Sequence, residues 1–128
     1  MSWGLVVRLS LFGAAMALLT VWVIPPQIEP LLWLAIFAVC AVVIARVRHD
    51  KHFVHGLCVS LLNSVYITAA HIAFAGPYLE RHPAEAAMAA GMGSPRLMML
   101  LTGPVIGLVT GVVLGGLAWL VSRFVKPR

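Results

Sequence analysis

LMMLLTGPVIGLVTGVVLGGLAWLVSRF, residues 97–124, contains no charged side chain before Arg123. At 1.5 Å per residue, a helix of this length can cross a bilayer hydrocarbon core about 30 Å thick. Three further apolar runs cover residues 3–24, 31–47 and 53–75. We therefore expect an all-α, polytopic membrane protein whose single domain, residues 1–128, is a bundle of four transmembrane helices.

The composition of the chain supports this expectation. Of its 128 residues, 62% are hydrophobic and only 10% are charged, whereas a soluble domain of this length has too little interior to bury so much apolar surface. The net charge of +5 does not indicate nucleic-acid binding, because the cations lie at the ends of apolar runs and form no basic patch. The lipid bilayer is the expected partner.

The connections between the runs are short, with one exception. The sequence PPQIEP at residues 25–30 breaks the helix, because proline removes a backbone donor and restricts the residue before it. The one sizeable loop covers residues 76–96. Within it, PAEAAMAA at residues 83–90 predicts one short surface helix that begins at Pro83 and stops at Gly91.

The distribution of cations predicts the orientation of the chain. Seven of the nine lysines and arginines fall on one side of the four spans, and only Arg81 and Arg96 fall on the other. The positive-inside rule then places both termini and the loop at residues 46–52 in the cytoplasm. We expect a multi-pass protein of a membrane such as the bacterial inner membrane. The seven cations on the cytoplasmic side are Arg8, Arg46, Arg48, Lys51, Arg123, Lys126 and Arg128.

Four glycines at intervals of four residues form a glycine-zipper pattern in the last run: Gly103, Gly107, Gly111 and Gly115. On a helix this spacing leaves a groove along one face, which another backbone can approach closely. The groove can pack against another helix of the same chain, which we favour, or against a second subunit. Pro104 should kink this helix or mark its start.

The third run carries a polar stripe within an arc of roughly 140°, made of Ser60, Asn63, Ser64, Thr68 and His71. Because polar side chains are costly against lipid, the stripe should face the bundle interior or a partner. Interhelical hydrogen bonding is the favoured interpretation. The alternative is a polar path for a solute or a proton, with His71 as the titrating residue.

Other candidate chemistry is weak. His49, His52 and His55 are spaced by three, so on a helix they cannot converge on one metal ion. Cys40 and Cys58 lie in apolar runs and are expected to be free thiols. No catalytic motif, paired carboxylates, metal site or cofactor site is recognisable.

Three functional classes follow. We favour a non-catalytic accessory, assembly or structural subunit that acts through helix packing, with a second copy or another membrane protein as partner. The first alternative is a small oligomeric transporter or channel for a proton or small solute. The second is a membrane enzyme or redox subunit. Enzyme activity is the less favoured expectation.

Overall fold

A computed structural model describes residues 1–127, which contain helices and no strand. Four of the helices are long and apolar enough to span a membrane: α1, α2, α3 and α6. Two short helices, α4 and α5, lie between α3 and α6. The helices are α1 (Trp3–Trp22), α2 (Glu29–Val47), α3 (His52–Ala73), α4 (Ala75–Arg81), α5 (Pro83–Met92) and α6 (Pro95–Ser122).

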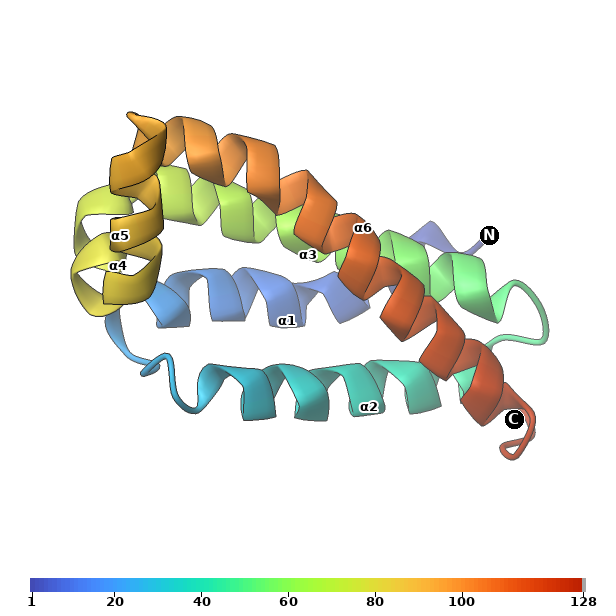
Figure 1. The fold of residues 1–128 in the computed structure, drawn as a ribbon. Coiled ribbons are helices and arrows are strands. Elements are labelled where there is room, and N and C mark those ends of the chain that lie inside the picture. The colour runs from blue at the N-terminus through green and yellow to red at the C-terminus, as the bar shows by residue number, and fades with distance from the viewer. Residues whose placement is uncertain (128) are drawn as a thin grey trace.

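The two ends of the bundle differ (Figure 1). The short helices α4 and α5 lie together at one end, which we call the capped end. The N-terminus, the loop between α2 and α3, and the last described residues of the chain lie at the other, which we call the terminal end. This arrangement is the one that an even number of long helices produces. The predicted position of Arg128 lies outside the described residues.

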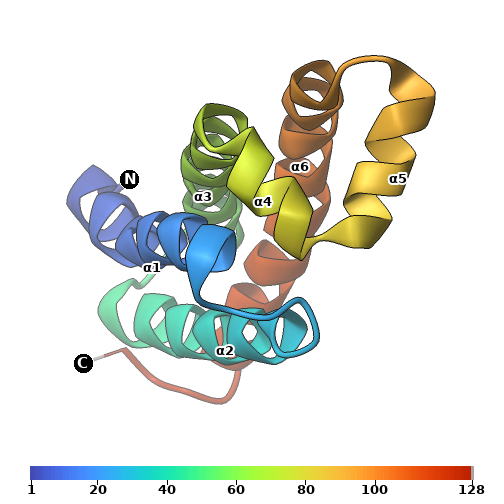
Figure 2. The same ribbon diagram turned by 90° about the vertical axis from the view of Figure 1, so that its left-hand side faces the viewer.

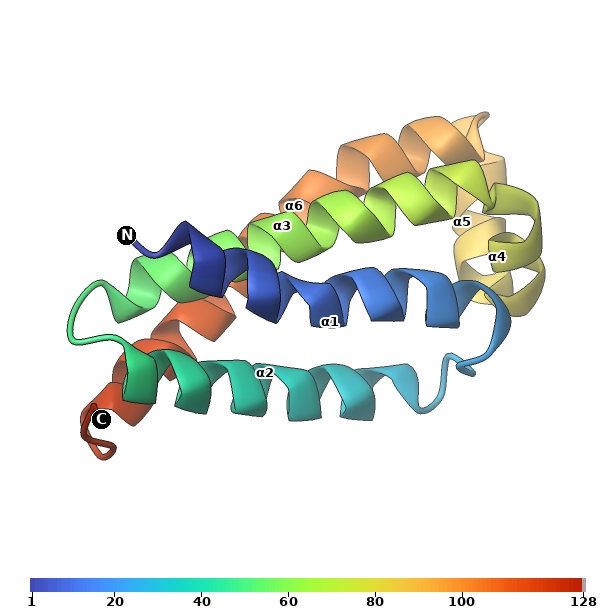
Figure 3. The same cartoon turned by 180° about the vertical axis from the view of Figure 1, so that it is seen from behind.

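α3 is the central helix of the bundle, since it packs most extensively on α6 and on α1. α2 follows α1 in sequence but contacts α6 far more than it contacts α1. Seen from the capped end, α2 and α6 stand well apart (Figure 2), whereas toward the terminal end they cross closely (Figure 3). A core of fully buried apolar residues, including Ile44, Val59 and Leu114, fills the terminal half where all four long helices meet.

The sequence predicted one short surface helix, but the structure has two. The third long helix ends at Ala73, where the sequence predicted residue 75, and Phe74 adopts a non-helical backbone before α4 begins. Pro77 fits the first turn of α4 because the first backbone N–H groups of a helix have no intrahelical partner.

The predicted helix boundaries need three further corrections. Gly91 does not stop α5, which continues to Met92 and ends at Gly93, whose φ of +80° is a conformation that glycine adopts without strain. α6 begins at Pro95, two residues earlier than predicted, because the Ser94 hydroxyl accepts the Leu97 N–H and caps it. Pro104 lies inside α6, so it does not mark the start of that helix.

Candidate ligand cavity

The four spaced glycines of α6 face α3. A Cβ atom at Gly107 would lie 2.5 Å from the Cβ of Ser64, and one at Gly115 would lie 2.6 Å from the Phe53 carbonyl oxygen. Equivalent atoms at Gly103 and Gly111 would meet Thr68 and Leu57 of the same helix. The groove that these glycines leave is thus occupied by α3 within one chain.

Sequence reasoning missed the matching small residues on α3. A Cβ at Gly56 would lie 2.7 Å from the Cα of Gly115, so two glycines meet where the helix backbones approach most closely. Gly56, Ser60, Ser64 and Thr68 are themselves spaced by four. This repeat of small residues was the signal in the sequence that could have paired α3 with α6.

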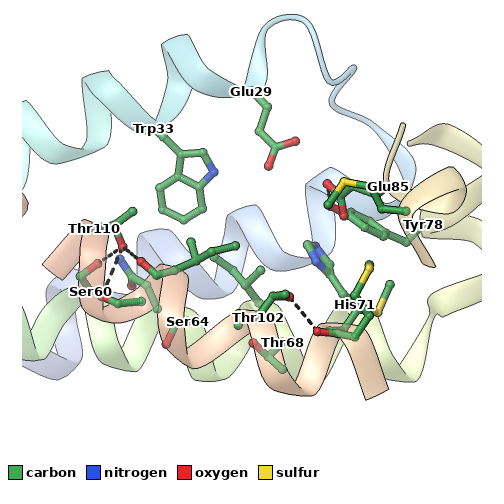
Figure 4. Close-up of a pocket in the computed structure, with 18 of the residues that line it drawn as sticks. Glu29, Trp33, Ser60, Ser64, Thr68, His71, Tyr78, Glu85, Thr102 and Thr110 are labelled. Carbon is green, nitrogen blue, oxygen red and sulfur yellow. Dashed lines mark hydrogen bonds between the residues drawn. The ribbon is translucent and has the colours of Figure 1, made fainter. Parts of the chain in front are cut away.

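All five residues of the polar stripe line one cavity of about 520 Å³. The cavity lies where α2 diverges from α6, with α3 as its floor, and residues of α4 and α5 line it at the capped end (Figure 4). The opposite wall comes from residues that the sequence analysis did not single out. They are Glu29, Trp33 and Phe37 of α2, Tyr78 of α4, Glu85 and Met88 of α5, and Thr102, Ile106 and Thr110 of α6.

Three of the hydroxyl groups on the cavity wall donate their proton to a backbone carbonyl. Ser64 donates to Leu61 at 2.7 Å, Thr102 to Met98 at 2.8 Å, and Thr110 to Ile106 at 2.7 Å. Ser60 lies 2.8 Å from the Thr110 hydroxyl oxygen, and because the Thr110 proton is already committed, Ser60 is the donor of that bond. The hydroxyls therefore offer lone pairs to the cavity.

Asn63 is the exception among the polar residues. Its side chain is only 2% exposed, yet neither its amide nitrogen nor its amide oxygen has a hydrogen-bond partner among the described residues. Gly13 of α1 packs against the amide group itself, since a Cβ there would lie 2.5 Å from the Asn63 Cγ and closer still to the amide oxygen. A buried amide without partners costs about 1–3 kcal/mol, so this residue calls for an explanation.

His71 connects α3 to α1. Its Nε2 lies 3.0 Å from the Thr20 hydroxyl, which donates its own proton to the Met16 carbonyl at 2.8 Å. The Thr20 oxygen must then accept from His71, so Nε2 carries the hydrogen and Nδ1 is the nitrogen left to accept a hydrogen bond. The sequence predicted that this side chain faces the bundle interior. In the structure it is buried, with 8% of its surface exposed.

At the capped end, Tyr78 lies between two histidine rings. Its ring centroid is 3.7 Å from that of His71 and 3.9 Å from that of His82. The Tyr78 hydroxyl donates to Glu85 Oε1 at 2.8 Å. Burial, followed by the negative charges of Glu85 and Glu29 and the bond to Glu85, raises the pKa of Tyr78 well above its usual range. The hydroxyl therefore stays protonated and remains a donor.

His82 lies against one carboxylate of the cavity wall. Its Nδ1 lies 2.8 Å from the Tyr78 carbonyl oxygen, and because a carbonyl can only accept, Nδ1 carries a hydrogen. Its Nε2 lies 3.4 Å from Glu29 Oε2. His82 therefore connects α4 to the start of α2.

Glu29 and Glu85 are the charged side chains on the wall of the cavity. Arg81 and Arg96 occupy the same end of the bundle but point to backbone carbonyls elsewhere, of Val23 at 3.4 Å and of Ile72 at 3.2 Å. Neither arginine lines the cavity. The capped end of the cavity is therefore acidic.

The three spaced histidines, His49, His52 and His55, lie at the terminal end and do not line the cavity. His55 is fully buried, donates from Nδ1 to the Lys51 carbonyl at 2.7 Å, and accepts the Ser2 N–H at Nε2 at 3.1 Å. His52 contacts the Arg48 carbonyl at 3.0 Å. Within residues 1–127, no cluster of three or more metal-ligating side chains is found. Both cysteines are free thiols.

Comparisons of the chain with protein-family models, with curated proteins and with solved structures found no match. Function must therefore be inferred from the cavity, where a buried amide without partners lies among apolar side chains and lone pairs, below an acidic end.

Proposed function

We propose that this chain is an integral membrane protein, with four spans and both termini in the cytoplasm, that binds a small solute in its cavity and serves in its transport. Four long apolar helices support the membrane assignment. The terminal end carries the N-terminus and the basic loop, which the positive-inside rule assigns to the cytoplasm. The cavity then opens in the outer half of the bilayer.

The observation that carries the solute-binding proposal is the cavity itself, which all five polar residues of the α3 stripe line. A volume of about 520 Å³ lies within the 300–1,000 Å³ that is usual for small-molecule sites. The wall is mostly apolar with a few convergent polar groups, which is the usual character of such sites.

The depth of the cavity in the membrane supports a role in transport. It reaches Ser60 and Thr110, and beyond them the core around Ile44 and Leu114 fills the terminal half of the bundle. A solute that enters from the outer side would stop near the middle of the membrane, where transporter substrates bind. Passage to the cytoplasm would require the helices of the terminal half to separate.

For the accessory-subunit function, the glycine groove does not supply the interface. Ser64, Thr68 and other residues of α3 fill it. A partner would need a different face of the bundle. The outward apolar residues of α2 and α6, such as Leu34 and Val109, would face lipid or a partner equally well.

Mass spectrometry of the purified protein tests solute binding. Protein extracted in mild detergent should release a small molecule on denaturation, and Asn63→Leu should release much less of it. Because leucine has a similar volume and no unmet polar atom, the variant should be as stable as the wild type or more so. The matched control is Val65→Leu, at an exposed position on the same helix.

Two outcomes would contradict the proposal. One is wild-type protein that binds no small molecule in detergent or in lipid. The other is an Asn63→Leu protein that retains the same molecules in the same amounts as wild type.

A further inference from the structure

We infer that the ligand of the cavity is an elongated amphipathic organic cation, with its charged nitrogen at the end lined by Glu29 and Glu85. This inference rests on the proposed function, because it names the class of solute that the cavity binds. Three independent features of the wall point to it: its charge, the indole ring of Trp33, and its hydrogen-bonding groups.

The first feature is the negative charge of the cavity wall. Each carboxylate has one oxygen already in contact with the protein, Oε1 of Glu85 with Tyr78 and Oε2 of Glu29 with His82. The second oxygen of each has no hydrogen-bond partner among the described residues. Glu29 faces the His82 imidazole, whereas Glu85 contacts only the neutral Tyr78 hydroxyl, and no arginine or lysine lines the wall. A cation would be attracted to this wall, whereas a phosphate or carboxylate would be repelled.

Trp33 supplies the aromatic face. It lies four residues after Glu29, so both side chains project from the same face of α2, and Figure 4 shows both directed across the cavity. Indole is the aromatic ring that attracts cations most strongly. Tyr78 cannot serve in the same way, because His71 and His82 cover both faces of its ring.

The remaining wall sets the shape of the ligand. From His71 to Ser60 the cavity follows twelve residues of α3, which is roughly 16 Å of helix. Apolar side chains such as Phe37 and Ile106 line this length. The polar groups on it are hydroxyl groups and His71 Nδ1. An apolar body with a polar substituent near its middle fits this lining.

Three ten-carbon probes with one chain length test the inference: decyltrimethylammonium, decanoate and decanol. Binding is measured by titration calorimetry on protein in lipid nanodiscs, with empty nanodiscs as the blank. We expect the ammonium to bind at least about tenfold more tightly than either of the others, because the two carboxylates attract the ammonium and repel decanoate. A Kd ratio near one would overturn the inference.

Variants of Glu29 and Glu85 test whether these two carboxylates bind the ammonium. Glu29→Gln and Glu85→Gln should each raise the Kd of the ammonium about tenfold and leave that of decanol unchanged. Glu80→Gln is the matched control, because Glu80 is an exposed acid on α4 that does not line the cavity. An equal loss in Glu80→Gln would show attraction to the surface charge alone and would contradict the inference.

The same experiment separates this inference from the proposed function. If decanol or decanoate binds as well as the ammonium, and Asn63→Leu weakens that binding, the cavity binds solutes but does not select cations. If none of the probes binds above the nanodisc blank and the purified protein releases no small molecule, both proposals fail.

Discussion

Gly56 of α3 and Gly115 of α6 touch through their backbones, since a Cβ at Gly56 would lie 2.7 Å from the Cα of Gly115. The next residue along α6, Gly116, has open space where a side chain would be. Two adjacent glycines in one helix thus have opposite surroundings. A comparison of the same substitution at the two positions therefore separates the effect of helix packing from the effect of helix propensity.

We predict that Gly115→Ala destabilises the protein by about 1–3 kcal/mol, because the new methyl group forces α3 and α6 apart. Gly116→Ala should be neutral or stabilising by up to about 1 kcal/mol, because alanine favours the helix and meets no neighbour. Thermal unfolding in one detergent compares the two. Equal effects at the two positions would leave the glycine spacing without a packing role.

The sequence was sufficient to predict the four long helices, because each must provide an apolar length that matches a bilayer. It also predicted that the polar stripe from Ser60 to His71 shares one face, since periodicity within one helix determines that. It could not predict the opposite wall of the cavity. Glu29 and Glu85 lie near connections, and their approach to α3 depends on how α2 and α5 pack, which helical periodicity does not specify.

The predicted topology is open to a direct test. Single cysteines at Ser2, His49 and Glu80, in a background without Cys40 and Cys58, should label from the cytoplasm, the cytoplasm and the outside, respectively. The expected pattern follows from the charge distribution and from the position of α4 at the end opposite the N-terminus. Labelling of Glu80→Cys from the cytoplasmic side would reverse the orientation and place the cavity on the inner side.

The last prediction concerns His71, which the sequence offered either as a helix bridge or as part of a proton path. In the structure it joins α3 to α1 through Thr20 and stacks on Tyr78. His71→Ala should therefore lower stability by about 1 kcal/mol, the usual net value of a buried hydrogen bond, with some further loss from the stack. His49→Ala is the control, since His49 is exposed in the loop between α2 and α3.

His71→Ala should not change proton flux, because we expect no proton flux in the wild-type protein. The cavity that His71 lines ends at Ser60 and Thr110, and the fully buried side chains of Ile44 and Leu114 lie in the core beyond them. Liposomes containing a pH-sensitive dye measure the flux, and wild type and variant should both match empty liposomes. A flux that is present in wild type and lost only in His71→Ala would mean that the terminal half opens and that His71 carries protons through it.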